Sequence, residues 1–180
     1  MQKKSPANLL ARECIVTALI QLASQKPLSA ITISELTQRA GVSRMTYYRN
    51  YQSKEEIFQT YMNDIVDAYR NDIFQKKIPE TFGQYENILH CFRYFEKYKE
   101  FITCLIHVGM ANLLLDALCS YITETFSTPD ASIRTNYTLM AYAGALFNVY
   151  IAWLKNDTRE PAESLADIIY DQFGPSTHTL

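Results

Sequence analysis

Two helix-start signals on either side of one glycine constrain this chain more than any other feature. Thr32 is followed three residues later by Glu35, and the same Ser/Thr-to-Glu spacing recurs from Ser53, which is the pattern of a capping box. Between them, Gly41 permits a left-handed turn and Ser43 can cap a new helix. The pattern predicts two short helices joined by a very tight turn, then a long helix.

Helical periodicity covers most of the remaining sequence. Apolar residues recur three or four positions apart, and the signals of strands and hairpins are weak. The longest apolar stretch, 141–154, is shorter than the roughly 20 residues of a membrane helix, so no membrane partner is expected. The predicted fold is all-α with about nine helices, over residues 9–25, 32–40, 43–51, 53–77, 82–99, 101–108, 110–127, 132–155 and 161–173.

Charge is divided unevenly along the chain. Residues 1–54 hold eight basic side chains, among them Lys3 and Lys4, and two acidic ones, a balance of +6. The rest holds nine basic and seventeen acidic side chains, a balance of −8. This division predicts that a polyanion such as nucleic acid binds the first segment only. The alternative is that the basic residues cluster there by chance.

The short helix after Ser43 has two separable faces. At about 100° per residue, Tyr47 and Tyr51 lie within roughly 40° of each other and are expected to point inward. The outward face then consists of Met45, Thr46, Tyr48 and Arg49.

This outward face suits the major groove of DNA. Guanidinium groups bind guanine edges, hydroxyls bind phosphates, and apolar atoms contact thymine methyls. We expect base contacts from Arg44, Met45, Thr46 and Arg49, and phosphate contacts from Tyr48 and Lys54. The alternative is a helical hairpin whose exposed arginines are merely solvated.

Residues 32–57, TISELTQRAGVSRMTYYRNYQSKEEI, resemble the signature of the TetR family of transcription regulators. The resemblance implies that Thr46 and Tyr48 touch DNA and that Lys54 binds a phosphate. Thr37 departs from the usual small alanine, Met45 from a frequent Gly or Pro, and Asn50 from a frequent His or Tyr. The expected DNA-binding residues are Thr32, Ser43, Arg44, Met45, Thr46, Tyr48, Arg49, Asn50 and Lys54.

Residues 142–154 and 161–166 resemble the end of a TetR subgroup, which implies a dimer region. Periodicity adds that the helix at 132–155 is apolar nearly all round and needs cover on several sides. The alternative is burial within one subunit. The expected interface residues are Ala141, Gly144, Ala145, Asn148, Ala152, Trp153, Leu165, Ile168 and Ile169.

Aromatic residues between 82 and 150 suggest an effector pocket, because such sites are apolar with a few polar groups. The same residues are equally typical of an ordinary helical core. The candidate lining residues are Tyr85, Phe92, Phe95, Cys104, His107, Met110, Tyr121, Tyr137 and Met140.

Several classes of function lack support. Cys14, Cys91, Cys104 and Cys119 form no C-x-x-C pair and indicate free thiols in a reducing cytoplasm. Cys104 with His107 falls short of the three or four ligands of a zinc site. Neither a nucleotide-binding nor a catalytic motif is present, so we predict no enzyme activity, metal or cofactor.

The sequence therefore predicts a helix-turn-helix DNA-binding domain at 1–54 and a helical-bundle domain for regulation, ligand binding and dimerisation at 55–180. The expected function is a cytoplasmic, ligand-responsive repressor that binds a pseudo-palindromic double-stranded DNA operator as a homodimer. Its effector would be small and apolar or aromatic. The alternative is a regulator or adaptor controlled by a partner protein.

Overall fold

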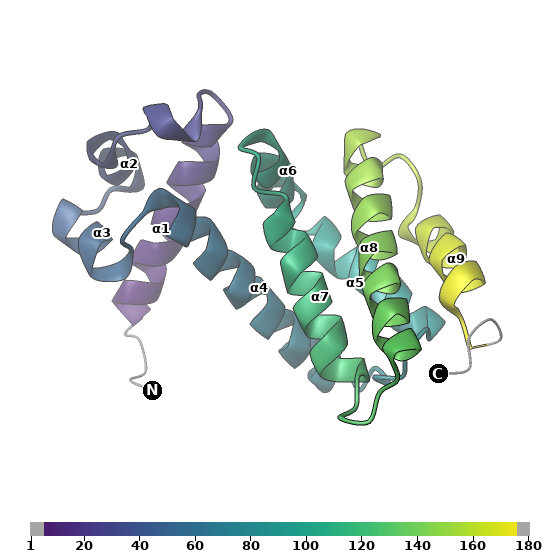
Figure 1. The fold of residues 1–180 in the computed structure, drawn as a ribbon. Helices are drawn as coiled ribbons and strands as arrows, with labels where there is room; N and C mark the ends of the chain where they lie inside the picture. The colour runs from purple at the N-terminus through teal and green to yellow at the C-terminus, as the bar shows by residue number, and fades with distance from the viewer. Residues whose placement is uncertain (1–5, 176–180) are drawn as a thin grey trace. The chain divides into compact units, whose positions relative to one another are not determined.

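The computed structural model describes residues 6–175, and within that range its regular elements are all helices (Figure 1). The predicted all-α class and nine α-helices are confirmed for this part of the chain, whereas Lys3 and Lys4 lie outside it. The elements are α1 (Pro6–Ala23), the 3-10 helix η1 (Leu28–Ala30), α2 (Ile33–Ala40), α3 (Arg44–Asn50), α4 (Lys54–Lys76), α5 (Tyr85–Glu96), α6 (Lys99–His107), α7 (Asn112–Phe126), α8 (Ile133–Lys155) and α9 (Ala162–Phe173).

The tight turn between α2 and α3 forms as its local sequence dictates. The Glu35 backbone N–H donates to Thr32 Oγ1 at 3.2 Å, which caps α2. Gly41 then adopts a left-handed φ of 67°, a conformation that costs a glycine little. The Thr46 N–H donates to Ser43 Oγ at 3.0 Å, which caps α3 two residues after the turn.

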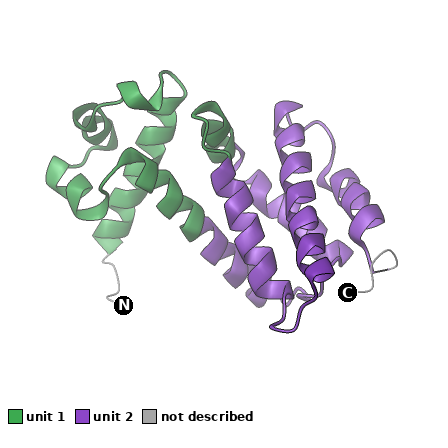
Figure 2. Ribbon diagram, in the orientation of Figure 1, with its two compact units in different colours: residues 1–64, 100–111 green, residues 65–99, 112–180 purple. Residues whose placement is uncertain are grey.

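The chain packs as two compact units (Figure 2). The headpiece consists of the described residues up to Asp64 together with Glu100–Ala111, and the body of Ile65–Lys99 with the described residues from Asn112 onward. The units divide α4 and place most of α6 with the headpiece. The two units describe how the chain packs and not what each part does. The predicted functional domains at 1–54 and 55–180 therefore stay a prediction.

The headpiece core is apolar with one buried cation. Ile15, Leu19 and Leu36 are fully buried, and α1 packs against both α2 and α3. Arg12 is only 7% exposed; its Nη2 lies 2.8 Å from Asp64 Oδ2 and its Nε donates to the Tyr51 hydroxyl at 3.2 Å. These partners offset the cost of burying a guanidinium, which is otherwise large.

The body is built from helix pairs around an aromatic cluster. α5 packs against α9, and α7 against α8. The Tyr69 ring on α4 lies 4.9 Å from the Tyr94 ring, 5.3 Å from Tyr121 and 5.6 Å from Phe95. Burial raises the pKa of Tyr69 well above its ordinary value, so its hydroxyl stays neutral.

Among the described helices, α8 alone is long and apolar enough to meet the length and composition of a membrane span. The core helix of a soluble protein meets the same two criteria, so the finding is weak support for a span. Only a third of its most apolar window is buried within the chain. α8 therefore presents an apolar surface that its own chain leaves uncovered.

Candidate nucleic-acid interface and effector cavity

The outward face of α3 is open to solvent. Met45 is 79% exposed and Tyr48 63% exposed. Arg44 and Arg49 are exposed as well, while Thr46 is half-buried. A methionine this exposed contributes nothing to the core. The predicted outward direction is thus confirmed for Met45, Tyr48 and Arg49, and the contact of this face with DNA stays a prediction.

The opposite face of α3 anchors the helix. Tyr47 is 1% exposed and Tyr51 2% exposed, as the angular spacing predicts. The Tyr47 ring meets the Tyr48 ring edge-on at 5.2 Å and 83°, and lies 6.2 Å from Tyr51. Burial raises the pKa of Tyr47 to about 12. The buried tyrosines hold a seven-residue helix that would not be stable alone and support the exposed ring of Tyr48.

Two arginines on the exposed face differ in freedom. Arg44 Nη2 donates to Ser34 Oγ at 2.8 Å, which ties the start of α3 to α2. Within residues 6–175, Arg49 has neither a hydrogen-bond nor an ion-pair partner. Arg49 is therefore the arginine of this face that is best placed to bind a base edge with two N–H donors.

Ion pairs neutralise two basic side chains of the described headpiece but none of the arginines on α2 and α3. Arg12 is neutralised by Asp64, and Lys26 Nζ lies 2.6 Å from a Glu35 oxygen. Over the same described residues the arginines of α2 and α3 have no carboxylate within ion-pair distance; they are Arg39, Arg44 and Arg49. These three guanidinium groups therefore keep a positive charge that can attract a phosphate backbone.

Three polar residues expected to bind DNA stabilise the helix ends of the headpiece. The Thr32 and Ser43 hydroxyls cap their own helices. Asn50 Nδ2 donates to the Thr46 carbonyl oxygen at 2.8 Å, and its Oδ1 accepts from Asn8 at 3.0 Å. Because both ends of its amide are engaged, Asn50 fixes the end of α3 to α1 rather than reaching outward.

Lys54 has a structural role that the sequence pattern does not show. Its Nζ donates to the carbonyl oxygens of Leu28 at 2.5 Å and Ile31 at 2.7 Å. The ammonium satisfies carbonyls near η1 and so fastens the first turn of α4 to the headpiece. The two carbonyls are more than twenty residues away in the sequence. The predicted contact of Lys54 with a phosphate stays a prediction.

Two family models match the chain. Residues 15–61 match the model described as bacterial regulatory proteins of the tetR family, and residues 84–173 match the TetR_C_8 model, a transcriptional regulator C-terminal region. The chain belongs to the TetR family. Members bind DNA and regulate transcription, and the matched relatives are regulators rather than enzymes.

One curated relative and two solved structures are similar to this chain, the structures in fold. The HTH-type transcriptional regulator AlkX of Mycobacterium tuberculosis is 29% identical over 89 residues, which are 49% of this chain and 42% of AlkX. The match thus spans less than half of that relative. NalD of Pseudomonas aeruginosa, a repressor of a multidrug efflux pump, has a TM-score of 0.65 at 16% identity, covering 93% of this chain and 97% of NalD. FadR of Bacillus subtilis, solved with stearoyl-CoA, has a TM-score of 0.59 at 15% identity, covering 92% and 99%.

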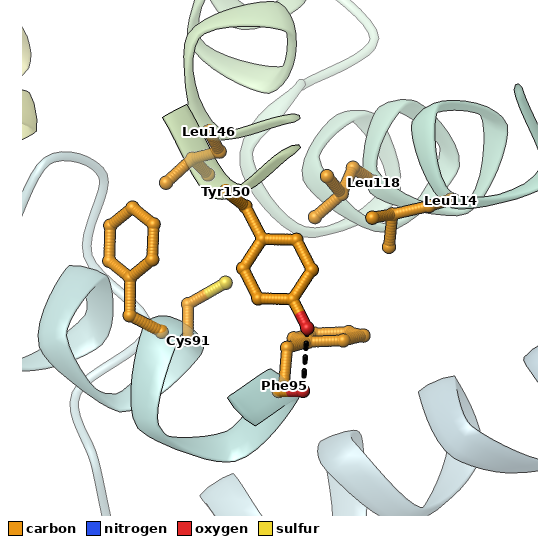
Figure 3. Close-up of a pocket in the computed structure, with 7 residues that line it drawn as sticks. Cys91, Phe95, Leu114, Leu118, Leu146 and Tyr150 are labelled. Carbon is orange, nitrogen blue, oxygen red and sulfur yellow. Dashed lines mark hydrogen bonds between the residues drawn. The ribbon is translucent and has the colours of Figure 1, made fainter. Parts of the chain in front are cut away.

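Two small cavities lie between α4, α5, α7 and α8, lined by described residues of the body. The larger cavity, about 30 Å³, reaches from Tyr69 on α4 to Tyr142 on α8. The smaller cavity, about 10 Å³, lies beside Tyr150. Figure 3 shows the Cys91 sulfur directed toward the Tyr150 ring, whose hydroxyl donates to the Phe95 carbonyl oxygen at 2.8 Å. In this conformation the larger cavity has room for a water or two.

Only some of the candidate pocket residues line these two cavities, and the effector pocket itself stays a prediction. Phe92, Phe95 and Tyr121 line the two cavities, and the other candidates do not. Tyr137 and Met140 are 68% and 56% exposed, because they lie on the side of α8 opposite the cavity. The other four candidates line neither cavity: Tyr85 lies in the body, and Cys104, His107 and Met110 belong to the headpiece unit.

Sequence reasoning missed two polar residues of α5. Asn87 and Cys91 line the larger cavity and are one helical turn apart, with Phe95 a further turn along. That four-residue spacing was a usable signal, because it places all three on one face. Burial raises the pKa of Cys91 to about 12, so its thiol is an unreactive neutral group.

The predicted dimer surface divides into exposed and buried parts. Ala141, Asn148, Ala152 and Ile168 are exposed, and Gly144 and Ala145 are half-buried. The other three are buried within the chain and were wrongly assigned to the interface: Trp153 at 3%, Leu165 at 6% and Ile169 at 2% exposure. They fill the body's core, where the Trp153 ring lies 6.0 Å from Tyr150 and its Nε1 donates to the Glu160 carbonyl.

Proposed function

We propose that this TetR-family regulator is a homodimeric repressor that leaves a pseudo-palindromic operator when a small apolar or aromatic effector enters its body. The exposure of Met45, Tyr48 and Arg49 above the buried Tyr47 carries the DNA-binding part of this proposal. The family's commoner role supports repression. The protein would act in the cytoplasm, where its cysteines stay reduced.

In the proposed complex, α3 enters the major groove of each half-site. Arg49 would bind a guanine edge, Met45 a thymine methyl group, and the Tyr48 hydroxyl a phosphate. Two copies of α3 in a twofold dimer would meet successive major grooves, which are about 34 Å apart. The operator's symmetry would then mirror that of the protein.

The uncovered apolar side chains of α8 and α9 support a homodimer. Ile133 is 76% exposed, Tyr137 68%, Met140 56% and, on α9, Ile168 54%. Contiguous exposed apolar groups of this kind mark an interaction surface. A second copy presenting the same helices would cover them in an isologous contact. Met140→Glu together with Ile168→Glu should yield a monomer in sedimentation equilibrium, and a persistent dimer would contradict this surface.

α4 supplies a physical route from effector to operator. Its first turn is fastened to the headpiece through Lys54, and further along it contributes Tyr69 and Ile73 to the wall of the larger cavity. An effector that displaces the cavity wall would therefore act on the helix that carries the headpiece anchor. A bias of a few kcal/mol suffices to change operator occupancy. On this scheme residues 1–54 bind DNA and 55–180 regulate and dimerise.

Operator binding can be tested without a known target. Selection from random duplexes would give the site, and fluorescence anisotropy at several salt concentrations would give affinity and salt dependence. Arg49→Ala should lose about 1–3 kcal/mol of binding and relax base choice at one position. Tyr48→Phe should weaken binding to all sequences alike. Arg159→Ala, an exposed arginine of the body, is the matched control; equal affinity for all four proteins would overturn the proposal.

The small size of the two cavities described above favours a second candidate, control by a partner protein. A space of about 30 Å³ accepts no drug-sized effector unless the body rearranges. If screening finds no small molecule that changes operator affinity, while a protein partner bound to the body does, the second candidate replaces the first.

A further inference from the structure

One residue that lines the larger cavity has a buried polar atom without a hydrogen-bond partner in the described part of the chain. Asn87 is 9% exposed and lines the larger cavity on α5. Its Nδ2 donates to the carbonyl oxygens of Pro79 and, at 3.1 Å, Thr81. Its Oδ1 is buried and, among the described residues, accepts no hydrogen bond. The two carbonyl contacts fix the orientation of the amide, because a flip would bring oxygen against oxygen.

A buried acceptor without a donor destabilises the closed cavity. Leaving such a group unpaired costs about 1–3 kcal/mol, which a ligand that supplies an O–H or N–H would recover. Tyr121 supplies no donor, since its hydroxyl donates to Glu80 Oε1 at 3.1 Å. No hydrogen bond described for the body runs from another side chain of the cavity wall to this oxygen. The site thus favours a ligand that donates.

The walls also restrict the charge of a ligand. Every side chain that lines either cavity is uncharged. Most are aromatic or aliphatic, among them Phe126, Leu118 and Leu146. A carboxylate or ammonium entering this space would lose its hydration without a counter-ion, at a large cost in free energy. A neutral, mostly apolar body meets no such penalty.

The two cavities can merge. Cys91, Leu118 and Leu146 line both of them, so these three side chains form the partition. Both leucines are unbranched at Cβ and can change rotamer. A cavity that accepts benzene is about 150 Å³, so a ring enters only if the partition moves and α7 or α8 shifts relative to α5. Ligand entry and conformational change are therefore the same event.

We infer that the effector is a small neutral single-ring molecule with one hydrogen-bond donor, of the phenol class, whose donor binds Asn87 Oδ1 while its ring displaces Leu118 and Leu146. This inference rests on the proposed ligand-responsive function and names the chemistry of its site.

Three probes of nearly equal size test it on the full-length protein: phenol, toluene, which lacks the donor, and benzoate, which is charged. Trp153 is the only tryptophan, and its ring lies 6.3 Å from Phe92 on the wall of the smaller cavity, so its fluorescence reports binding alongside calorimetry. Phenol should bind about tenfold more tightly than toluene, the value of one buried hydrogen bond, and benzoate should not bind.

Asn87→Leu should abolish the preference for phenol over toluene, and Asn71→Leu, an exposed asparagine on α4, should keep it. If Asn87→Leu does not fold, the three probes on the unmodified protein still decide. Toluene binding as tightly as phenol, benzoate binding best, or no binding at millimolar concentration would each overturn the inference. Operator affinity of the ligand-free protein is measured on the same preparation and does not depend on the three probes. A loss of operator binding alone would therefore contradict the proposed function and leave this inference untouched.

Discussion

Tyr48 in the headpiece is 63% exposed, whereas Tyr69 in the body is 5% exposed and enclosed by other aromatic rings. Both are helical tyrosines, yet one faces solvent because its neighbour Tyr47 takes the inward position, and the other lies where α4 meets α5 and α7. In the headpiece, exposed aromatic and apolar groups mark a binding face. In the body, aromatic groups fill the core, and the exposed apolar groups of α8 mark a partner.

Truncating Tyr47 should have the largest effect on stability. Tyr47→Ala removes a fully buried ring from the headpiece and should lower the free energy of unfolding by about 3–5 kcal/mol. Tyr48→Ala, one residue along, should change it by about 0.5 kcal/mol or less. Urea denaturation followed by circular dichroism measures both. Similar losses for the two variants would break the distinction between the inner and outer faces of α3.

Lys54→Met should have the next largest effect and separates anchoring from DNA contact. The variant keeps the apolar stem but loses the hydrogen bonds to Leu28 and Ile31, so the free energy of unfolding should fall by about 1–3 kcal/mol. The slope of log operator affinity against log salt should stay unchanged. A slope shallower by about 0.9 would instead show that Lys54 neutralises a phosphate.

Tyr47→Phe should have a smaller and opposite effect. The Tyr47 hydroxyl is buried without a hydrogen-bond partner among the described residues, so its removal leaves no group unsatisfied. The free energy of unfolding should rise by about 1 kcal/mol, with operator affinity unchanged. Destabilisation on thermal melting would reveal a partner for this hydroxyl in solution.

The smallest expected effect is a pH dependence from the body. His90 stacks on Tyr69, and its Nε2 lies 3.0 Å from Asp72 Oδ2, which is also 2.9 Å from Lys76 Nζ. Burial, and then the Lys76 ammonium, lower the pKa of His90 and outweigh the opposing Asp72 carboxylate.

Because the pKa of His90 is lower in the folded protein, the unfolded chain binds more protons below about pH 6.5. Stability should therefore be constant above that pH and fall as the pH drops below it. His90→Gln should reduce this fall in melting temperature. A variant with the same pH profile as the unmodified protein would show that His90 does not contribute.

The headpiece was largely predictable because its signals are local. Thr32, Gly41 and Ser43 act on their own backbone or on that of residues three positions away. Their effect can therefore be predicted from the neighbouring sequence. The inward direction of Tyr47 follows from helical geometry alone. The same local reasoning could not find that Lys54 reaches the carbonyl of Leu28, since that contact depends on how the segments pack.

By itself, the sequence determined the family, the helices and the exposed face of α3, since short-range hydrogen bonds and helical periodicity act within a few residues. Tertiary structure decided which body side chains meet. The rotation of each helix about its axis turns Asn87 and Cys91 toward a cavity, Trp153 into the core, and Tyr137 and Met140 outward. That rotation is set jointly by all the packed helices, because an apolar helix such as α8 has several faces that could be buried equally well.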